Sequence, residues 1–440
     1  MNAPATTDAA PRRRGVSPLV LAGGLLLGLV IRLSLIAEKG TADMDSYIEW
    51  GHRTLDLGLT NAYSGIYFPV AYQVFASTVR IAEITGISEI AAVKLVNLCC
   101  DLATLALLAL VLRRWRVPLS YILIYWLNPF FLAIFWLGYV DAQMSALLMA
   151  FVAILVYGRG RWAELLAGVP LALLVMLKPQ GALVVVALVA LAAVALVQRR
   201  SATLPLAVAR MLVAPALLFV LLSAWIATSP LHGPAYLLQT VVDTRSVMPS
   251  LSANMPNIWA IVAEAYRAPG DPIWSVMTPD VYHDLATLLT LAAVVGAIAW
   301  SLPRLASWSL SQQVSAAVAA VMLIYPMTAT AAHENHLFLG GTATVLVAAI
   351  LADTRVLVWL NVLLVAQFAN LFALYGFGLN DLSSDALGWL LPNYTPTARF
   401  VAAIVSVACW LALLGALGRS VEQRAEADVA RPVQRSARTG

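Results

Sequence analysis

The amino-acid sequence predicts an all-α, polytopic membrane protein with about twelve transmembrane helices and further helices in its extracytoplasmic loops. Hydrophobic residues make up 61% of the chain and charged residues only 11%, whereas an ordinary soluble domain is about one quarter charged. The mean hydropathy is +0.83. The apolar residues recur as segments long enough to cross a bilayer, which favours one transmembrane bundle over several soluble domains.

The first expected span covers residues 16–36 and follows a polar N-terminal tail, residues 1–15, that carries three consecutive arginines. This run is too long for a signal-peptide core and lacks a small-residue cleavage site. We therefore expect it to remain as a helix with a cytoplasmic N-terminus. The other spans are expected at residues 91–112, 118–138, 141–157, 162–177, 181–197, 206–228, 284–302, 313–330, 336–352, 356–375 and 398–418.

The arginines set the expected orientation. Arg113, Arg159, Arg199 and Arg355 fall in loops on the side of the N-terminus, and positive charge in short loops marks the cytoplasmic side. We expect a multi-pass protein of the cell (inner) membrane with both termini in the cytoplasm, a single transmembrane domain over residues 16–420, and a disordered tail over residues 421–440. The long external segments are about 37–90, 229–283 and 376–397.

Three carboxylates follow the first span, in a chain that uses acidic residues sparingly. Asp45 and Glu49 are four residues apart and would share a helix face, while Asp43 stands where a side chain would cap that helix. Acidic residues are common at helix starts because they complement the helix dipole. A structural helix start and a functional acidic site both remain open at this point.

Asp101 is expected inside the second span. Burying an aspartate in the middle of a membrane helix costs about 2.5–3.5 kcal/mol on insertion scales, so such a residue is either functional or part of a pair. We favour the structural interpretation, in which Asp101 is a hydrogen-bonded or ion-paired strut between neighbouring spans.

Other polar residues gather at the expected outer ends of the spans. A lysine there either extends to the lipid headgroups or binds a phosphate. The two histidines of the segment 333–336 are three residues apart and lack the i, i+4 spacing of a zinc helix, so contacts to an anionic group are favoured over a metal. The candidates are Tyr67, Lys94, Asp141, Lys178, Gln180, Arg245, Asn254, Asn257, His333 and Glu334.

Taken in order, the motifs resemble the GT-C glycosyltransferases. They are most similar to the bacterial relatives of the GPI mannosyltransferases and of the lipid-linked-oligosaccharide glucosyltransferases, over roughly residues 17–352. The motifs are Asp-Met-Asp-Ser-Tyr-Ile-Glu-Trp (43–50), Tyr67-Phe68-Pro69, Val93-Lys94 with Asp101, Asn128-Pro129, Gly138-Tyr139-Val140-Asp141, Lys178-Pro179-Gln180, Ser252-Ala253-Asn254 with Asn257-Ile258-Trp259, and His333-Glu334.

The resemblance implies a polyprenyl-phosphate sugar as donor, a reaction on the extracytoplasmic face, and a hexose, with mannose favoured, transferred to a glycolipid or glycan acceptor. It implies Asp43 as the first-loop aspartate, Asp45 as the second acid, and His333 with Glu334 as the His-Glu pair. The chain departs from the family pattern at Phe68, where proline is usual, and at Tyr139, where glutamine is usual.

The chemistry of such a transfer agrees with the residues. The departing phosphate is a good leaving group that needs charge stabilisation but no general acid, so one carboxylate acting as general base is enough. We expect Asp43 to be this base, with Asp45 second. The cations expected to stabilise the phosphate are Lys178, His333, Arg245 and Lys94. We expect no protein metal site and no certain cofactor, with Mg²⁺ or Mn²⁺ possible.

Two other classes remain as alternatives. A proton-coupled secondary transporter would place its polar groups near the bilayer midplane and repeat one half of its fold in the other. The sequence shows no clear internal repeat, and its polar motifs lie near the ends of spans. A noncatalytic subunit for envelope assembly is the third alternative. No feature of the sequence indicates a nucleic-acid partner.

Overall fold

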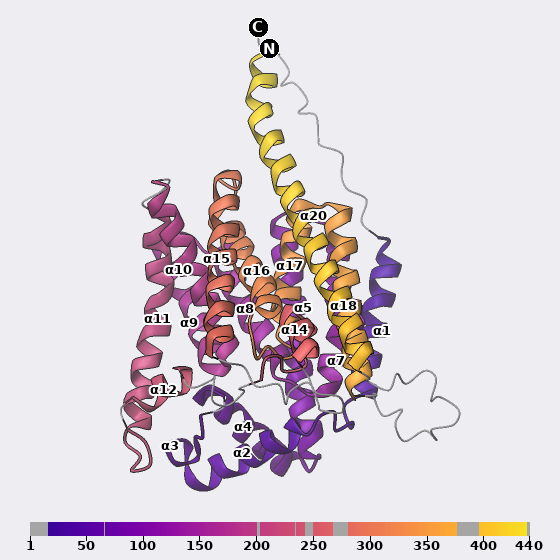
Figure 1. Cartoon of the computed structure of the whole chain (residues 1–440). Coiled ribbons are helices and arrows are strands. Elements are labelled where there is room, and N and C mark those ends of the chain that lie inside the picture. Colours follow the sequence, from indigo (N-terminus) through magenta and orange to yellow (C-terminus); the bar gives the residue numbers. More distant parts are fainter. Residues whose placement is uncertain are drawn as a thin grey trace, which may run out of the picture.

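The computed structural model describes residues 16–65, 67–199, 203–233, 235–242, 250–266, 280–375 and 396–437, and these form a bundle of helices (Figure 1). The helices are α1 (Pro18–Ser34), α2 (Asp43–Leu57), α3 (Leu59–Ala62), α4 (Pro69–Thr85), α5 (Glu89–Arg114), α6 (Ile122–Leu127), α7 (Pro129–Leu137), α8 (Asp141–Tyr157), α9 (Gly160–Leu177), α10 (Ala182–Val197), α11 (Thr203–Ile226), α12 (Tyr236–Val242), α14 (Ile258–Tyr266), α15 (Asp280–Arg304), α16 (Leu310–Thr328), α17 (Leu337–Leu351), α18 (Thr354–Tyr375) and α20 (Pro396–Ala437).

Every segment expected to span the membrane coincides with a helix or a helix pair. Among the described residues, eight helices are long and apolar enough to cross a membrane, and α6 with α7 forms a further, bent crossing. The 48° bend falls at Asn128. The Asn128 side chain accepts a hydrogen bond from the Phe130 amide and caps the start of α7, the second helix of this pair. The other three segments, α1, α8 and α17, are shorter apolar helices of 15–17 residues. The expected all-α, polytopic membrane fold is confirmed.

The helices α2, α3 and α4 lie together across one end of the bundle, which we call the α2–α4 end (Figure 1). The two longer helices pack closely because Gly51 of α2 has no side chain: a Cβ there would lie 2.7 Å from the Phe75 carbonyl oxygen of α4. At the centre of the bundle, α17 is buried along almost its whole length. The C-terminal part of α20 projects from the opposite end (Figure 1).

Asp101 is a strut, as expected. Its carboxylate accepts a hydrogen bond from Arg32 Nε of α1 at 2.7 Å and another from the Tyr125 hydroxyl of α6. The same arginine donates to the Trp126 carbonyl oxygen at 2.9 Å and lies 3.8 Å from the centre of the Trp126 ring. Both charged side chains are almost completely buried. One ion pair thus holds α1, α5 and α6 together within the membrane.

The structure differs from expectation at the C-terminus. Residues 421–437, expected to be disordered, continue α20 as helix. Their Ala, Glu and Arg residues favour helix, and Arg424 and Asp428, one turn apart, form an ion pair at 3.7 Å. Arg304 and Glu422 approach to 4.0 Å and connect α15 to this extension.

We expect Asp101→Leu to destabilise the protein strongly, because it leaves the Arg32 guanidinium buried without its carboxylate. Removing one partner of a buried pair typically costs about 3–5 kcal/mol of unfolding free energy. Unfolding in detergent micelles measures the loss. The double variant Arg32→Leu/Asp101→Leu is expected to recover much of the lost unfolding free energy. An Asp101→Leu variant as stable as the wild type would contradict the structural role of the Arg32–Asp101 pair.

Candidate functional site

The backbone that carries Asp43 is held against the end of α7. Gly40 has a φ of +79°, and a Cβ at this position would lie 2.5 Å from the Trp136 carbonyl oxygen and 2.6 Å from that of Leu137. The next residue, Thr41, donates its amide hydrogen to the Leu137 carbonyl oxygen at 3.3 Å. Only glycine fits such an approach without strain, so the start of α2 is fixed relative to the bundle.

One face of α2 borders a cavity of about 630 Å³. The residues on this face are Asp43, Ser46, Tyr47 and Trp50, and their i, i+3, i+4, i+7 spacing places them along one side of a helix. Asp45 does not line the cavity. Its side chain is 64% exposed and pairs with Lys39 at 2.7 Å. The structure therefore separates the two aspartates that the sequence proposed together.

The cavity has a polar part and an apolar part. The polar part is lined by Asp43, Tyr67, Tyr139, Lys178, Gln180, His283, Thr330, His333, Asn335 and His336. The apolar part lies between three membrane helices, α10, α15 and α16, and includes Leu183, Val186, Leu291, Val294 and Val321. Among the described lining residues, Asp43 is the only carboxylate.

Lys178 is a buried cation at the polar part of the cavity. Its Nζ lies 3.3 Å from Asp141 Oδ2, and the same carboxylate oxygen accepts a hydrogen bond from Asn335 Nδ2 at 3.0 Å. The ammonium also lies 5.4 Å from the centre of the Tyr67 ring. Burial lowers the pKa of Lys178, but Asp141, Tyr67 and Asp43 together raise it, and the net shift is upward. Lys178 is therefore a permanent positive charge in the cavity wall.

Glu334 lies behind the cavity wall and does not line the cavity. Its Oε1 accepts hydrogen bonds from the Tyr139 hydroxyl at 2.8 Å and the Tyr375 hydroxyl at 2.7 Å. Its Oε2 lies 3.9 Å from His333 Nδ1 and has no hydrogen-bond partner within the described part of the chain. Glu334 thus acts on the cavity through its charge.

The two histidines before α17 both line the cavity. His336 Nδ1 accepts a hydrogen bond from the His333 amide at 3.3 Å, so the neutral ring carries its proton on Nε2. Burial lowers the pKa of His336 far below its ordinary value, and His333 and Lys178 lower it further. Burial also lowers the pKa of His333, against the charge of Glu334, which raises it. Both rings are neutral donors at neutral pH.

The Asp43 side chain is exposed and opens onto this cavity, while the protein around it replaces part of its water shell. Burial raises the pKa of Asp43 above its ordinary value, and the nearby charge of Glu334 raises it further. Lys178 and His333 act in the opposite direction. The result is a carboxylate that is a stronger base than a fully solvated aspartate.

Three of the expected substrate-binding residues have structural roles instead. Lys94 does not line the cavity; it is buried and donates to the carbonyl oxygens of Leu35, at 3.2 Å, and of Trp136. Asn257 caps the start of α14 and donates to two backbone carbonyls of the segment 326–329. Asn254, with a φ of +69°, pairs by its backbone with His333. The two asparagines hold the loop that carries the histidines.

Of the remaining expected residues, two line the cavity and one lies outside the part of the chain that the structure describes. Tyr67 and Gln180 line the cavity, and the Tyr67 hydroxyl lies 2.9 Å from that of Tyr47. Arg245 lies outside the described residues. His336 was paired with His333 in the sequence as a contact to an anionic group but was not among the candidate site residues, and both histidines line the cavity. Trp50, which ends the acidic stretch, was not selected from the sequence. Over the ranges that the structure describes, no three His, Cys, Asp or Glu side chains are grouped as metal ligands would be.

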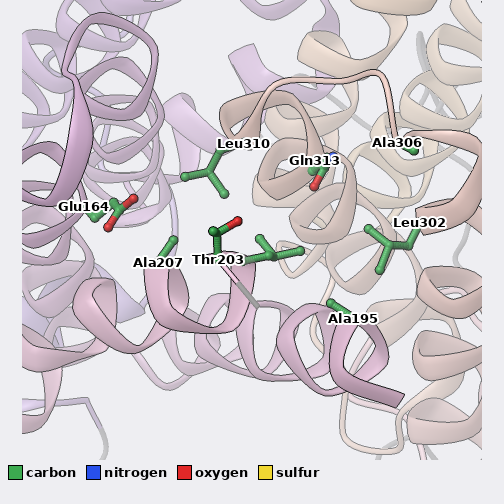
Figure 2. Close-up of a pocket in the computed structure, with 9 residues that line it drawn as sticks. Glu164, Ala195, Thr203, Ala207, Leu302, Ala306, Leu310 and Gln313 are labelled. Atoms are coloured by element: carbon green, nitrogen blue, oxygen red, sulfur yellow. The ribbon is translucent and has the colours of Figure 1, made fainter. Parts of the chain in front are cut away.

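A second cavity, of about 310 Å³, lies at the end of the bundle opposite α2–α4 (Figure 2). It is formed where α9, α11 and α16 begin and α10 and α15 end. Figure 2 shows its residues around the opening, with Glu164 at one side. The Glu164 carboxylate pairs with Arg210 at 2.7 Å. The mainly apolar lining offers no group of polar side chains comparable to that around Asp43.

Comparison with known proteins supports the fold. No protein-family model matches the sequence, and no curated protein matches it. Among solved structures, the chain is similar to the crystal structure of ArnT from Cupriavidus metallidurans bound to undecaprenyl phosphate, with a TM-score of 0.50 and 13% identity over 92% of this chain and 78% of that one. The chain therefore shares its overall fold with this structure.

We expect the charges around Asp43 to control its protonation in predictable directions. Glu334→Gln removes a negative charge and should lower the pKa of Asp43, whereas Lys178→Gln removes a positive charge and should raise it. A carbodiimide modifies protonated carboxyl groups, so the pH midpoint of Asp43 labelling, read by mass spectrometry, reports the shift. Movement of the two midpoints in the same direction would contradict this electrostatic arrangement.

Proposed function

We propose that the protein is an inverting glycosyltransferase that moves a hexose, with mannose favoured, from a polyprenyl-phosphate donor to a glycolipid or glycan acceptor. One observation carries this proposal. Among the described residues, a single carboxylate opens onto a cavity that is also lined by a buried cation and three histidines and that continues between membrane helices. An enzyme whose leaving group is a phosphate needs one base and a site for an anion.

The apolar part of the cavity suits the lipid of such a donor. Leu183 and Val186 of α10 face Leu291 and Val294 of α15 across it, and both helices are long enough to cross a membrane. A prenyl chain that leaves the bilayer between these helices would keep its apolar surface away from water. The ArnT structure, which is similar in fold, contains undecaprenyl phosphate.

The polar part of the cavity suits the phosphate. Lys178 supplies a positive charge that Asp141 holds in position. His333 and His336 add ring N–H groups that remain neutral donors and need not change charge during the reaction. Preorganised donors of this kind stabilise charge that develops on a leaving group.

Asp43 is then the general base. Its carboxylate accepts the proton of the acceptor hydroxyl while the hydroxyl oxygen bonds to the anomeric carbon. The bond between that carbon and the phosphate oxygen breaks, and the phosphate leaves with the electron pair. Attack from the side opposite to the phosphate inverts the anomeric centre. The raised pKa of Asp43 favours this proton transfer.

The distribution of arginines favours an extracytoplasmic site. Arg113, Arg159, Arg304 and Arg355 lie where helices begin or end away from the α2–α4 end, and positive residues mark the cytoplasmic side. The polar part of the cavity is lined by α2 and by residues at helix ends and in loops, such as Lys178 and His333, whereas a transporter would hold its substrate near the bilayer midplane. The carboxylate of Asp101, which lies inside the bundle, forms an ion pair with Arg32 and is therefore not free to carry a proton for a transporter.

We expect Asp43→Asn to reduce sugar transfer by about 10²–10⁴-fold, the usual contribution of a general base. Asp45→Asn is the matched control, because Asp45 lies two residues away on the exposed side of α2 and should retain nearly full activity. The assay is the release of polyprenyl phosphate from mannosyl, glucosyl and galactosyl donors by purified protein with envelope lipids and glycans as acceptors. If wild type consumes none of these donors, the proposed function fails; if Asp43→Asn stays active, the base is another group.

We expect His336→Ala to lower kcat by about 10²–10³-fold, as removal of one preorganised donor does. His336→Gln should retain much more activity because its amide N–H can reach the position of Nε2. His52→Ala is the control, since His52 pairs with Glu89 at 2.5 Å and does not line the cavity. Equal activity of the Ala and Gln variants would show that the Nε2 proton is not used.

A further inference from the structure

The cavity has an aromatic wall that the proposed chemistry of Asp43 and the phosphate does not use. Tyr67 stands next to Lys178, and the Trp50 ring lies 5.7 Å from the Tyr67 ring, centre to centre. Trp50 is half-buried and borders the cavity. Its ring is stacked on Tyr72 at 5.4 Å. The wall therefore runs from the cation, past Tyr67, to an indole ring that neighbouring rings hold in place.

The position of Trp50 relative to Asp43 is fixed by one helix. The two residues are seven apart on the cavity face of α2, which places them about 10 Å apart along the helix axis. Ser46 lies between them on the same face and contributes a hydroxyl. A molecule that lies along this face would contact the Asp43 carboxylate at one end and the indole at the other.

The geometry of an in-line displacement indicates whether the molecule along this face of α2 is the donor or the acceptor. The acceptor hydroxyl and the phosphate must approach the anomeric carbon from opposite sides, and Asp43 must contact the acceptor hydroxyl. The phosphate is assigned to Lys178 and the neutral histidines, so the donor sugar lies between these phosphate-binding groups and Asp43. The α2 face beyond Asp43, towards Trp50, is then left for the acceptor.

We propose that Trp50 and Ser46 form an acceptor subsite that binds a sugar ring, with one face of the ring stacked on the indole. This inference rests on the proposed function and deepens it, because it assigns the residues that bind the sugar ring of the acceptor. The C–H bonds on one face of a pyranose are apolar and slightly positive, and they complement the negative face of an aromatic ring. A rigid aromatic surface with few polar groups suits such a ring better than a peptide or a phosphate.

The direct test is saturation-transfer NMR with methyl glycosides of mannose, glucose and galactose added to the purified full-length protein. We expect saturation of the ring protons of at least one glycoside by wild type, loss of this signal in Trp50→Ala, and its retention in Trp50→Phe. Glu49→Gln, on the other face of α2, is the control and should behave as wild type. No saturation by wild type, or equal saturation in Trp50→Ala, would overturn the subsite.

Kinetics separate this inference from the proposed function. Trp50→Ala should raise the KM for the acceptor glycan by about tenfold or more, while slow hydrolysis of the donor by water stays at the wild-type rate. A parallel loss of donor hydrolysis would instead place Trp50 in the donor site and overturn the assignment. Absence of donor consumption by wild type would refute the proposed function and leave the NMR result to decide the sugar subsite. Trp50→Leu, which keeps bulk without an aromatic face, replaces the Ala variant if that variant does not fold.

Discussion

The candidate site depends on the hydrogen bonds that the last backbone carbonyl groups of α7 accept. The last carbonyls of a helix have no partner within it, and at α7 they are buried in the bundle. The ammonium of Lys94 binds the Trp136 carbonyl oxygen and the Thr41 amide binds that of Leu137. A cation at this position also complements the negative end of the helix dipole. Through these contacts the bent span α6–α7 fixes the residues that lead into Asp43.

The charges of the site are arranged in two layers. The carboxylates of Asp141 and Glu334 are buried behind the wall, where Lys178 and Asn335 contact Asp141 and two tyrosines donate to one oxygen of Glu334. The side chains that face the cavity are mainly cationic or neutral donors. Such a cavity attracts an anion, and the inner carboxylates keep its cation charged and in place. Asp43 is the exception, and its elevated pKa follows first from burial and then from the nearby charge of Glu334.

The sequence predicted the elements of the fold well and the site only in part. Apolar segments of spanning length and the need to pair Asp101 follow from the cost of charge in lipid, so they can be recognised without knowing the packing. The choice between Asp43 and Asp45 depends on which face of α2 packs against the bundle, and this is decided by Gly51 and α4. The position of Lys94 away from the cavity could not be predicted, because nothing in its sequence neighbourhood reveals the carbonyls of Leu35 and Trp136, which it contacts. The spacing of His333 and His336 indicated contacts to an anionic group, but the orientation of His336 depends on a turn between two helices.

The short central helix α17 has a consequence for how the protein is assembled. Its 15 residues span only about 22 Å, less than the roughly 30 Å of hydrocarbon that a lone helix must cross. It is enclosed by protein along nearly its whole length, so its stable environment is provided by other helices, including α16 before it and α18 after it. The loop immediately before α17 also depends on α18, because the Tyr375 hydroxyl at the end of α18 donates a hydrogen bond to Glu334 in that loop. A chain that ended before α18 would contain Asp43 and Lys178 but would lack this contact behind the cavity wall.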